Sequence, residues 1–445
     1  ALAQRLPEYM RPTVWVRTDD VVLNPAGKLD RKSLPVPDFG ALLSEHVAPA
    51  TPLEDALASV MAGVLGVDRV SVTEDFFTLG GDSILSIQLA SMARAAGLAL
   101  SPREVFEHRT VRSMARVAAH EERAMPMLGE PDGVASPVPP VVGWMIEHSD
   151  IPDDFRDFSQ SMVLRAPDGI TAAALGDVLA TVVAAHPMLT VRLSDGPDGW
   201  CLIPDGEFDP ASAVGEVVMS GDADADVTEG FRQAAARLDP MRGQLVSASL
   251  LIGNGPARVV LVIHHLGVDA VSWSILVEDL VTAWLGTQHG DVPDLRAEQT
   301  SAAAWFRAVD GRRDVHAAEI EYWRARLPGS PFAFGADLDP ETDRERTVSV
   351  TTRRVGSEIT EPILTRIPDA FGATTNDVLL AALARAVRSW QRDRGVGDTT
   401  PVSVLVEGHG RYDDVLATGA DPRRADLTRT VGWFTSIAPV AIDPA

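Results

Sequence analysis

The chain has 445 residues, 45% of them hydrophobic, and a formal net charge of -24 from 39 Lys and Arg against 63 Asp and Glu. At roughly 100 to 200 residues per domain, this length predicts several domains, and the apolar content excludes a wholly disordered chain. The acidic balance argues against a protein whose main work is binding nucleic acid or an anionic membrane surface.

No apolar run approaches the roughly 18 residues that span a bilayer, and the N-terminus lacks the pattern of a signal peptide. We therefore expect a cytoplasmic protein without a membrane segment. A single cysteine cannot form an intrachain disulfide. Cys201 stands among apolar neighbours, so we expect it to be a small core residue.

The first 40 residues carry short apolar runs separated by turn chemistry. Residues 14–16 and 21–23 are apolar, and the turn residues Asn24 to Gly27 follow, with a glycine that can adopt a positive φ. This pattern predicts a β-hairpin tail. The last residues form an apolar strand with no closing helix, so we expect the chain to be cut inside a domain at both ends.

A small helical module is predicted over residues 48–122. Thr51 opens the first amphipathic helix with a capping box and a proline at the first helical position. A second helix follows two glycines, and Ser101 and Thr110 cap two shorter ones. A module of this kind is near the lower size at which a domain folds alone.

Ser83 stands at the start of the second helix of this module, after Gly80, Gly81 and Asp82. Either Asp82 or Ser83 is expected to be the N-cap, which is the usual role of these residue types. A nucleophile elbow is excluded because the second glycine of GxSxG is missing. A serine at a helix N-terminus can also carry a phosphate that the helix dipole and free N–H groups stabilise.

Beyond a linker at residues 123–136, rich in Pro, Gly and acids, helix and strand patterns alternate to residue 445. The run ARVVLVIHHL predicts a strand buried on both faces, and TPVSVLVEGHG predicts another. Between them, NDVLLAALARAVRSWQ predicts a long helix begun by Asn376. Residues 137–445 are therefore expected to form an α/β domain.

Three polar groups follow the apolar segments of this domain. In the first, His265 and Asp269 could meet across a turn, and paired histidines with an aspartate can bind zinc. There is no HExxH and no cysteine partner, so we expect no metal. His264 alone is best interpreted as a hydrogen-bonded core histidine, with Asp269 orienting a loop.

The second group, EGHGR, places Glu407 at the mouth of a strand, just before Gly408 and Gly410, where a lone glutamate would usually pair with an arginine such as Arg411. The third, RTVGWFTS, includes Trp433 and could be no more than an aromatic turn packed on the core. Taken one at a time, neither group requires a catalytic role.

The run DFFTLGGDSI resembles the phosphopantetheine attachment motif of peptidyl carrier proteins in nonribosomal peptide synthetases. The resemblance implies that a phosphopantetheinyl transferase esterifies Ser83 with 4'-phosphopantetheine. Asp82 before this serine is similar to carriers that serve an epimerization domain. The string NPAGKLDRK resembles the last core motif of an adenylation domain, with Lys28 in the position of the lysine that contacts the acyl adenylate. Residues 1–40 would then be an adenylation-domain tail, and residues 48–122 a small all-α four-helix carrier bundle.

The strings HHxxxDxVSW, EGHGR and RTVGWFTSxxP, in this order, resemble core motifs of epimerization domains. These domains belong to the condensation superfamily and have a two-lobed chloramphenicol-acetyltransferase-like α/β fold. The resemblance implies that residues 137–445 form such a domain with an incomplete second lobe. Ala270 departs from the pattern, because a glycine normally follows the aspartate, and the first core motif is matched only loosely at residues 141–144.

Inversion at Cα requires one group that removes a proton and another that returns one to the opposite face. A thioester suits this reaction because its carbonyl delocalises the carbanion as an enolate. The resemblance implies His265 and Glu407 as the general acid and base, with His264, Asp269 and Trp433 in support. The aminoacyl or peptidyl thioester would arrive on the arm of Ser83. The implied partners are the rest of the adenylation domain and the downstream synthetase modules.

Two other functions remain open. A condensation domain that forms a peptide bond would use His265 without needing Glu407. A noncatalytic docking domain would keep the fold while Ala270 and the truncation abolish turnover. Coincidental motifs in an unrelated α/β protein are disfavoured, because five independent strings occur in the expected order.

Overall fold

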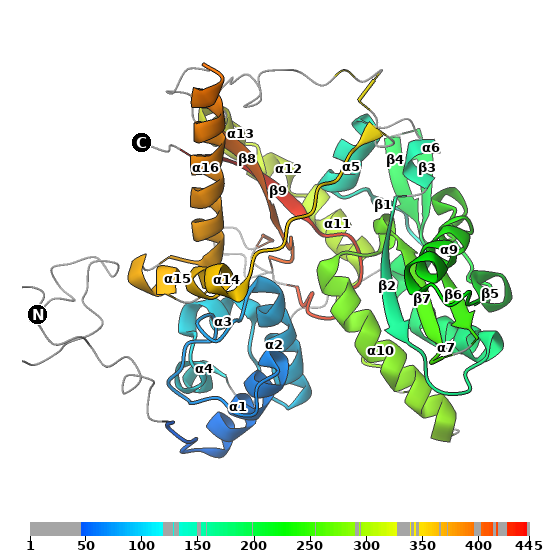
Figure 1. The fold of residues 1–445 in the computed structure, drawn as a ribbon, viewed down its shortest axis with the longest axis horizontal. Coiled ribbons are helices and arrows are strands. Elements are labelled where there is room, and N and C mark those ends of the chain that lie inside the picture. Colours follow the sequence, from blue (N-terminus) through cyan, green and yellow to red (C-terminus); the bar gives the residue numbers. More distant parts are fainter. Residues whose placement is uncertain are drawn as a thin grey trace, which may run out of the picture.

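The computed structural model describes most of the chain from residue 46 onward (Figure 1). The described residues are 46–118, 128, 133–148, 153–156, 158–197, 199–253, 255–289, 293, 295–326, 339, 342–343, 347–364, 366–371, 373–395, 402–412, 415–416 and 425–442. The expected adenylation tail, with Lys28, lies outside the described residues, as does most of the expected linker.

Residues 46–118 form the predicted four-helix module. Its helices are α1 (Pro52–Leu65), α2 (Ser83–Ala95), α3 (Pro102–His108) and α4 (Val111–Val117). Each begins at a capping side chain, with Thr51, Asp82, Ser101 and Thr110 accepting main-chain N–H groups of the first turn. Their apolar faces meet in one core, which includes Leu57, Met61, Phe76, Leu89 and Met114. The predicted helix caps are confirmed, although the capping box at Thr51 does not form: the Glu54 carboxylate accepts the N–H of Ala50 instead.

The first lobe contains the elements from β1 to α11 and is built on a sheet in the order β2-β7-β6-β5 (Figure 1). Its strands are β2 (Ser159–Arg165), β5 (Val214–Val218), β6 (Val246–Ile252) and β7 (Arg258–His264). Only β5 runs parallel to its neighbour. β7 is buried from its second residue to its last, which confirms the strand predicted from ARVVLVIHHL.

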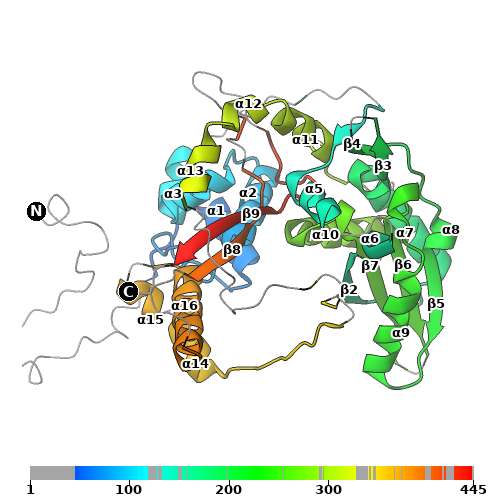
Figure 2. The same ribbon diagram turned by 90° about the horizontal axis from the view of Figure 1, so that it is seen from above.

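Helices cover both faces of this sheet (Figure 2), and alternate residues of β7 pack against one helical layer or the other. Val260 and Val262 pack with α9 (Ala223–Ala235), whereas Leu261 and Ile263 pack with α7 (Ala172–Ala185) and α10 (Ala270–His289). Because side chains alternate along a strand, a continuous apolar run is what a sheet covered on both faces requires.

A second, three-stranded sheet in the order β1-β4-β3 stands beside the first. Its strands are β1 (Ser136–Pro137), β3 (Arg192–Gly196) and β4 (Gly199–Ile203), and it packs near α5 (Pro140–Glu147) and α11 (Ala302–Asp310). Cys201 lies on β4 and is only half-buried, so the prediction of a core cysteine is wrong. Shorter elements are α6 (Asp153–Arg156), η3 (Pro187–Thr190), α8 (Pro210–Ala213), η4 (Pro240–Arg242), η5 (His265–Gly267), α12 (Arg313–His316) and α13 (Glu319–Arg326).

The second lobe contains α14 (Ser357–Leu364), α15 (Arg366–Phe371), α16 (Thr375–Asp393) and the antiparallel pair β8 (Val402–Gly408) and β9 (Ser436–Ile442). The cap of α16 is Thr374, in a capping box with Asp377, rather than the predicted Asn376. β8 forms where predicted, but the expectation of a buried strand is wrong: Leu405 is 64% exposed, because β9 is its only neighbour among the described strands.

Helix α2 of the small module also contacts the first lobe, beside α10 (Figure 2). Leu89 faces the module's own core, whereas Ile84 and Ile87 pack into the cluster formed by α7, α10 and β7. Arg94 at the end of α2 forms an ion pair with Asp426. The module is therefore docked on the larger domain through both an apolar and an ionic contact.

A buried ionic network ties the segment of residues 425–434 to the first lobe. The imidazole of His186 lies 2.8 Å from Asp279 through Nε2 and 2.7 Å from Glu298 through Nδ1. Arg429 forms an ion pair with Asp279. Burial disfavours the charged imidazole, but the hydrogen bonds to the two carboxylates outweigh it and raise the pKa of His186.

This network predicts that stability depends on pH. The folded pKa of His186 lies above its ordinary value of 6.5, so the network stabilises the fold fully below about pH 6.5, and this contribution is lost as the pH rises through the folded pKa. We expect the urea midpoint to fall from pH 6 to pH 9, and to fall less in His186→Gln. The exposed His46→Gln variant should follow the wild type. An equal pH slope in His186→Gln would contradict this assignment.

Candidate active site

The paired histidines lie where β7 ends and the 3-10 turn η5 begins. His264 Nδ1 accepts the N–H of Leu266 at 3.1 Å, so its Nε2 carries the proton and donates to the carbonyl of Phe155 at 2.7 Å. Burial lowers the pKa of His264 to about 4. His264 is thus a neutral, fully bonded core histidine, as predicted.

His265 is half-buried between two aromatic rings. Its ring stacks on Phe158 at 5.0 Å between centroids and lies 4.1 Å from the ring of Trp433. Its main-chain N–H donates to the carbonyl of Phe158 at 2.8 Å. Burial lowers the pKa of His265, against the opposing effect of its own carbonyl and the carboxylates of Asp269 and Glu407. The imidazole is therefore neutral at neutral pH and able to accept a proton.

Asp269 does not bond to His265, although the sequence left that pairing open. It is 3% exposed, and its carboxylate accepts hydrogen bonds from the two terminal guanidinium nitrogens of Arg411, Nη1 and Nη2, at 2.5 and 3.0 Å. The N–H groups of Ser272 and Phe434 donate to the same carboxylate, at 2.9 and 3.1 Å. Burial acts to raise the pKa of Asp269, but Arg411 and these N–H groups hold it below its usual range.

Arg411 is held by partners from two segments, residues 269–272 and 430–434. Beside Asp269, it donates to Ser272 Oγ and to the carbonyl of Thr430, both at 3.0 Å, and its guanidinium lies 4.2 Å from the ring centroid of Phe434. The alternative pairing of Arg411 with Glu407 is therefore wrong. Gly410 precedes it at φ 67, where a Cβ would lie 1.6 Å from the carbonyl oxygen of Phe434, so this turn requires glycine.

Glu407 lies on β8 opposite Ile437 of β9, and its side chain is exposed. Within the described part of the chain it makes no hydrogen bond or ion pair, yet it is close enough for its charge to act on His265. His265 and Glu407, which sequence reasoning selected, therefore lie on different lobes but within electrostatic reach of one another. Trp433 lies against His265, so the aromatic turn borders the site as well as the core.

Ser83 is the first residue of α2 and is partly exposed. Asp82 is the cap, accepting the N–H groups of Ile84 and Leu85 at 2.8 Å, and the described residues offer the Ser83 hydroxyl no hydrogen bond. A Cβ on Gly81 would lie 2.4 Å from the ring of Phe76, so the approach to this helix requires glycine. The accessible hydroxyl at a helix N-terminus suits a covalently attached phosphate.

Sequence reasoning missed Gln160, although it named Trp273 as part of a motif. Gln160 lies on β2, 2.8 Å from His265 Nε2 through its amide nitrogen, and its amide oxygen accepts Trp273 Nε1–H at 2.7 Å. The strand SQSMVLR carries no local signal for this role, which depends on β2 pairing with β7. Ala270 begins α10 and is exposed, so its methyl group is accommodated.

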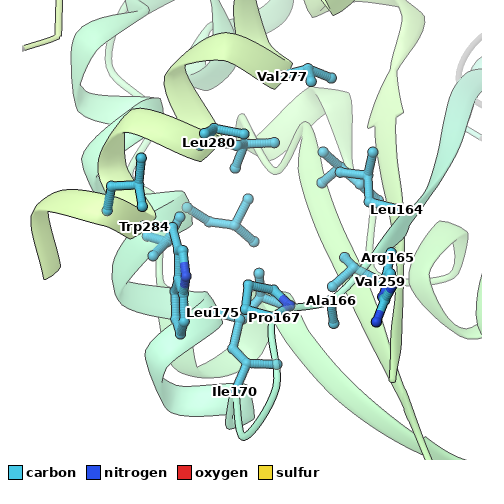
Figure 3. Close-up of a pocket in the computed structure, with 15 residues that line it drawn as sticks. Leu164, Arg165, Ala166, Pro167, Ile170, Leu175, Val259, Val277, Leu280 and Trp284 are labelled. Atoms are coloured by element: carbon cyan, nitrogen blue, oxygen red, sulfur yellow. The ribbon is translucent and has the colours of Figure 1, made fainter. Parts of the chain in front are cut away.

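An apolar cavity of about 220 Å³ lies between α7, α10 and the edge of the sheet (Figure 3). It is lined by aliphatic side chains, Trp284 and one charged residue, Arg165. It holds no pair of acid and base groups, so the chemistry is assigned to the region around His265.

Among the described residues, no helix has both the length and the apolar character needed to cross a membrane.

Two family profiles match the chain: one described as "Condensation domain" over residues 144–445, and one described as "Phosphopantetheine attachment site" over residues 55–118. The chain belongs to the condensation-domain family. A linear gramicidin synthase of Brevibacillus parabrevis is 34% identical to it over 99% of this chain, which spans 8% of that protein. The resemblance to nonribosomal peptide synthetases is thus confirmed.

Solved structures share its two-lobed, chloramphenicol-acetyltransferase-like fold. The epimerization domain from the third module of tyrocidine synthetase B matches with a TM-score of 0.55 and 24% identity, over 70% of this chain and 67% of that one. The first condensation domain of the calcium-dependent antibiotic synthetase matches with a TM-score of 0.51 and 19% identity, over 70% of each chain. The fold is therefore common to domains of both names and does not separate the two reactions.

The chain thus combines a carrier domain with a catalytic domain of the condensation superfamily. The carrier domain is of the kind that bears covalent phosphopantetheine.

The buried pair of Asp269 and Arg411 predicts a large stability effect. Asp269→Asn leaves the guanidinium of Arg411 buried without a countercharge, which costs about 3 to 5 kcal/mol when one partner of such a pair is removed. Urea unfolding measures the loss. The matched control is Asp205→Asn, whose pair with Arg192 is largely exposed and should matter little. Equal effects of the two substitutions would refute a structural role for the buried pair.

Proposed function

We propose that the domain epimerizes Cα of an aminoacyl or peptidyl thioester, from L to D, while the substrate is attached through phosphopantetheine to Ser83. The main support is that the charge of Glu407 reaches His265, since peptide-bond formation would use His265 without needing this carboxylate. Trp273 and the EGHGR string, which resemble epimerization motifs, add to it.

The proposed reaction transfers one proton off Cα and another onto its opposite face. One of His265 and Glu407 takes the Cα proton while the C–H electron pair passes into the enolate, and the other group returns a proton. When bound, the phosphopantetheine arm supplies the thioester whose carbonyl makes this proton acidic. The neutral imidazole of His265 suits the accepting role, and its contacts with Phe158 and Trp433 fix the direction of its ring.

The proposal extends to the domain organisation. Residues 1–40 would be the tail of an adenylation domain, in which Lys28 contacts the acyl adenylate, and residues 48–122 the carrier. Residues 123–136 would be the linker to an epimerization domain over 137–445. The partners would be the rest of the adenylation domain and the downstream synthetase modules.

The test is to load Ser83 with an L-aminoacyl-phosphopantetheine in deuterated buffer and to follow deuterium at Cα and the chirality of the released amino acid. We expect deuterium uptake and D-product, reduced at least about 100-fold by Glu407→Gln or His265→Ala, as expected for loss of a general acid or base. Glu216→Gln, at another exposed strand position, is the matched control and should keep full activity.

The competing functions give different results in the same assay. If Cα keeps its hydrogen and a peptide forms when an acceptor aminoacyl carrier is added, the domain is a condensation domain. If neither reaction occurs and the loaded carrier still binds, the domain serves docking. Unchanged exchange in Glu407→Gln would remove this glutamate from the mechanism.

A further inference from the structure

Three side chains from separate elements form a hydrogen-bonded chain that ends at His265. The indole Nε1 of Trp273, on α10, lies 2.7 Å from Oε1 of Gln160 on β2. The amide Nε2 of Gln160 lies 2.8 Å from Nε2 of His265 on η5. Trp273 is buried, with 8% of its surface exposed, and Gln160 is half-buried.

The direction of this chain follows from its first member. An indole N–H can only donate, so the atom of Gln160 that faces Trp273 must be the amide oxygen. The amide NH2 therefore faces His265, and because it can only donate, His265 Nε2 must be the acceptor. A flipped amide would set two donors against each other at the indole. The proton of the neutral imidazole is thereby assigned to Nδ1.

The surroundings of the ring agree with this tautomer. Nδ1 is buried and has no partner with full hydrogen-bond geometry among the described residues, but the carbonyls of His265 and Val268 act on the ring as hydrogen-bond acceptors and raise its pKa, as acceptors beside a ring N–H do. Phe158 and Trp433 cover the ring, so its two nitrogens cannot exchange places without moving both aromatic side chains. The ring orientation and the proton position are therefore held by different contacts.

We propose that Trp273 and Gln160 are positioning residues that hold His265 as the Nδ1–H tautomer, so that Nε2 bears the lone pair and is the ring nitrogen that accepts a proton. The imidazolium form would bring Nε2–H against the Gln160 NH2 group, so the same contact disfavours premature protonation. The catalytic consequence rests on the proposed epimerization. When the substrate enters, the hydrogen bond from the Gln160 N–H to Nε2 breaks. The Cα proton then moves to Nε2, and the C–H electron pair moves into the enolate.

The test reads the ring of His265 directly, without substrate. In the full chain labelled with 15N-histidine, two-bond 1H–15N correlations distinguish protonated from unprotonated ring nitrogens. His265 is identified among the 10 histidines by comparison with His265→Asn. We expect the wild type to show a protonated Nδ1 and a bare Nε2. Gln160→Met and Trp273→Phe should give a mixture of tautomers.

A negative charge introduced at this contact gives a sharper result. In Gln160→Glu, one carboxylate oxygen accepts from Trp273 and the other favours a proton on His265 Nε2, so the pKa of His265 should rise by about 1 to 3 pH units. The other titratable groups that act on this ring are Asp269 and Glu407, which raise its pKa, and the neighbouring His264. Gln244→Glu, an exposed position, is the matched control and should leave the titration unchanged.

The outcomes separate this inference from the proposed function. An Nε2–H tautomer in the wild type, or an unchanged titration in Gln160→Glu, overturns the positioning role whatever the activity. The expected tautomer without any deuterium exchange at Cα supports the positioning role and overturns epimerization. If both hold, the low-pH limb of the exchange rate in Gln160→Glu should move to higher pH, because the base must be unprotonated.

Discussion

The arrangement of the site depends on one buried ion pair, between Asp269 and Arg411. Two opposite charges buried in a protein are tolerated only when their remaining hydrogen-bond donors and acceptors also have partners. Here two segments supply those partners. The carboxylate receives main-chain N–H groups of Ser272 and Phe434, and the guanidinium donates to the carbonyl of Thr430. The pair therefore joins the turn that carries His265, the loop after the strand of Glu407, and the aromatic turn.

Side chains of residues 425–434 make three separate contacts. Asp426 binds Arg94 of the carrier helix, Arg429 enters the buried network of His186, and Trp433 lies against the ring of His265. These residues follow one another in a short, buried stretch. One segment of main chain therefore connects the carrier contact with the ring of Trp433 beside His265.

The sequence predicted those features that depend on local chemistry. Capping residues such as Thr51 and Thr110 marked helix starts, and the apolar run of β7 marked a strand covered on both faces. It predicted the burial of β8 wrongly, because burial of a strand depends on which elements lie beside it. Gln160 was missed for the same reason: it acts on His265, 105 residues away, only through the register of β2 against β7.

Inversion requires that one of the two proposed groups lacks a proton while the other carries one. His265 is enclosed by aromatic rings, and burial favours its neutral form, whereas Glu407 is exposed on a hairpin strand. If both groups carried a proton, neither could remove one from Cα, and if both lacked one, the enolate would have no donor on its opposite face. A neutral imidazole with a directed lone pair defines one of these roles before the substrate arrives. The direction of the Trp273–Gln160 hydrogen bonds therefore bears on which nitrogen of His265 receives the Cα proton.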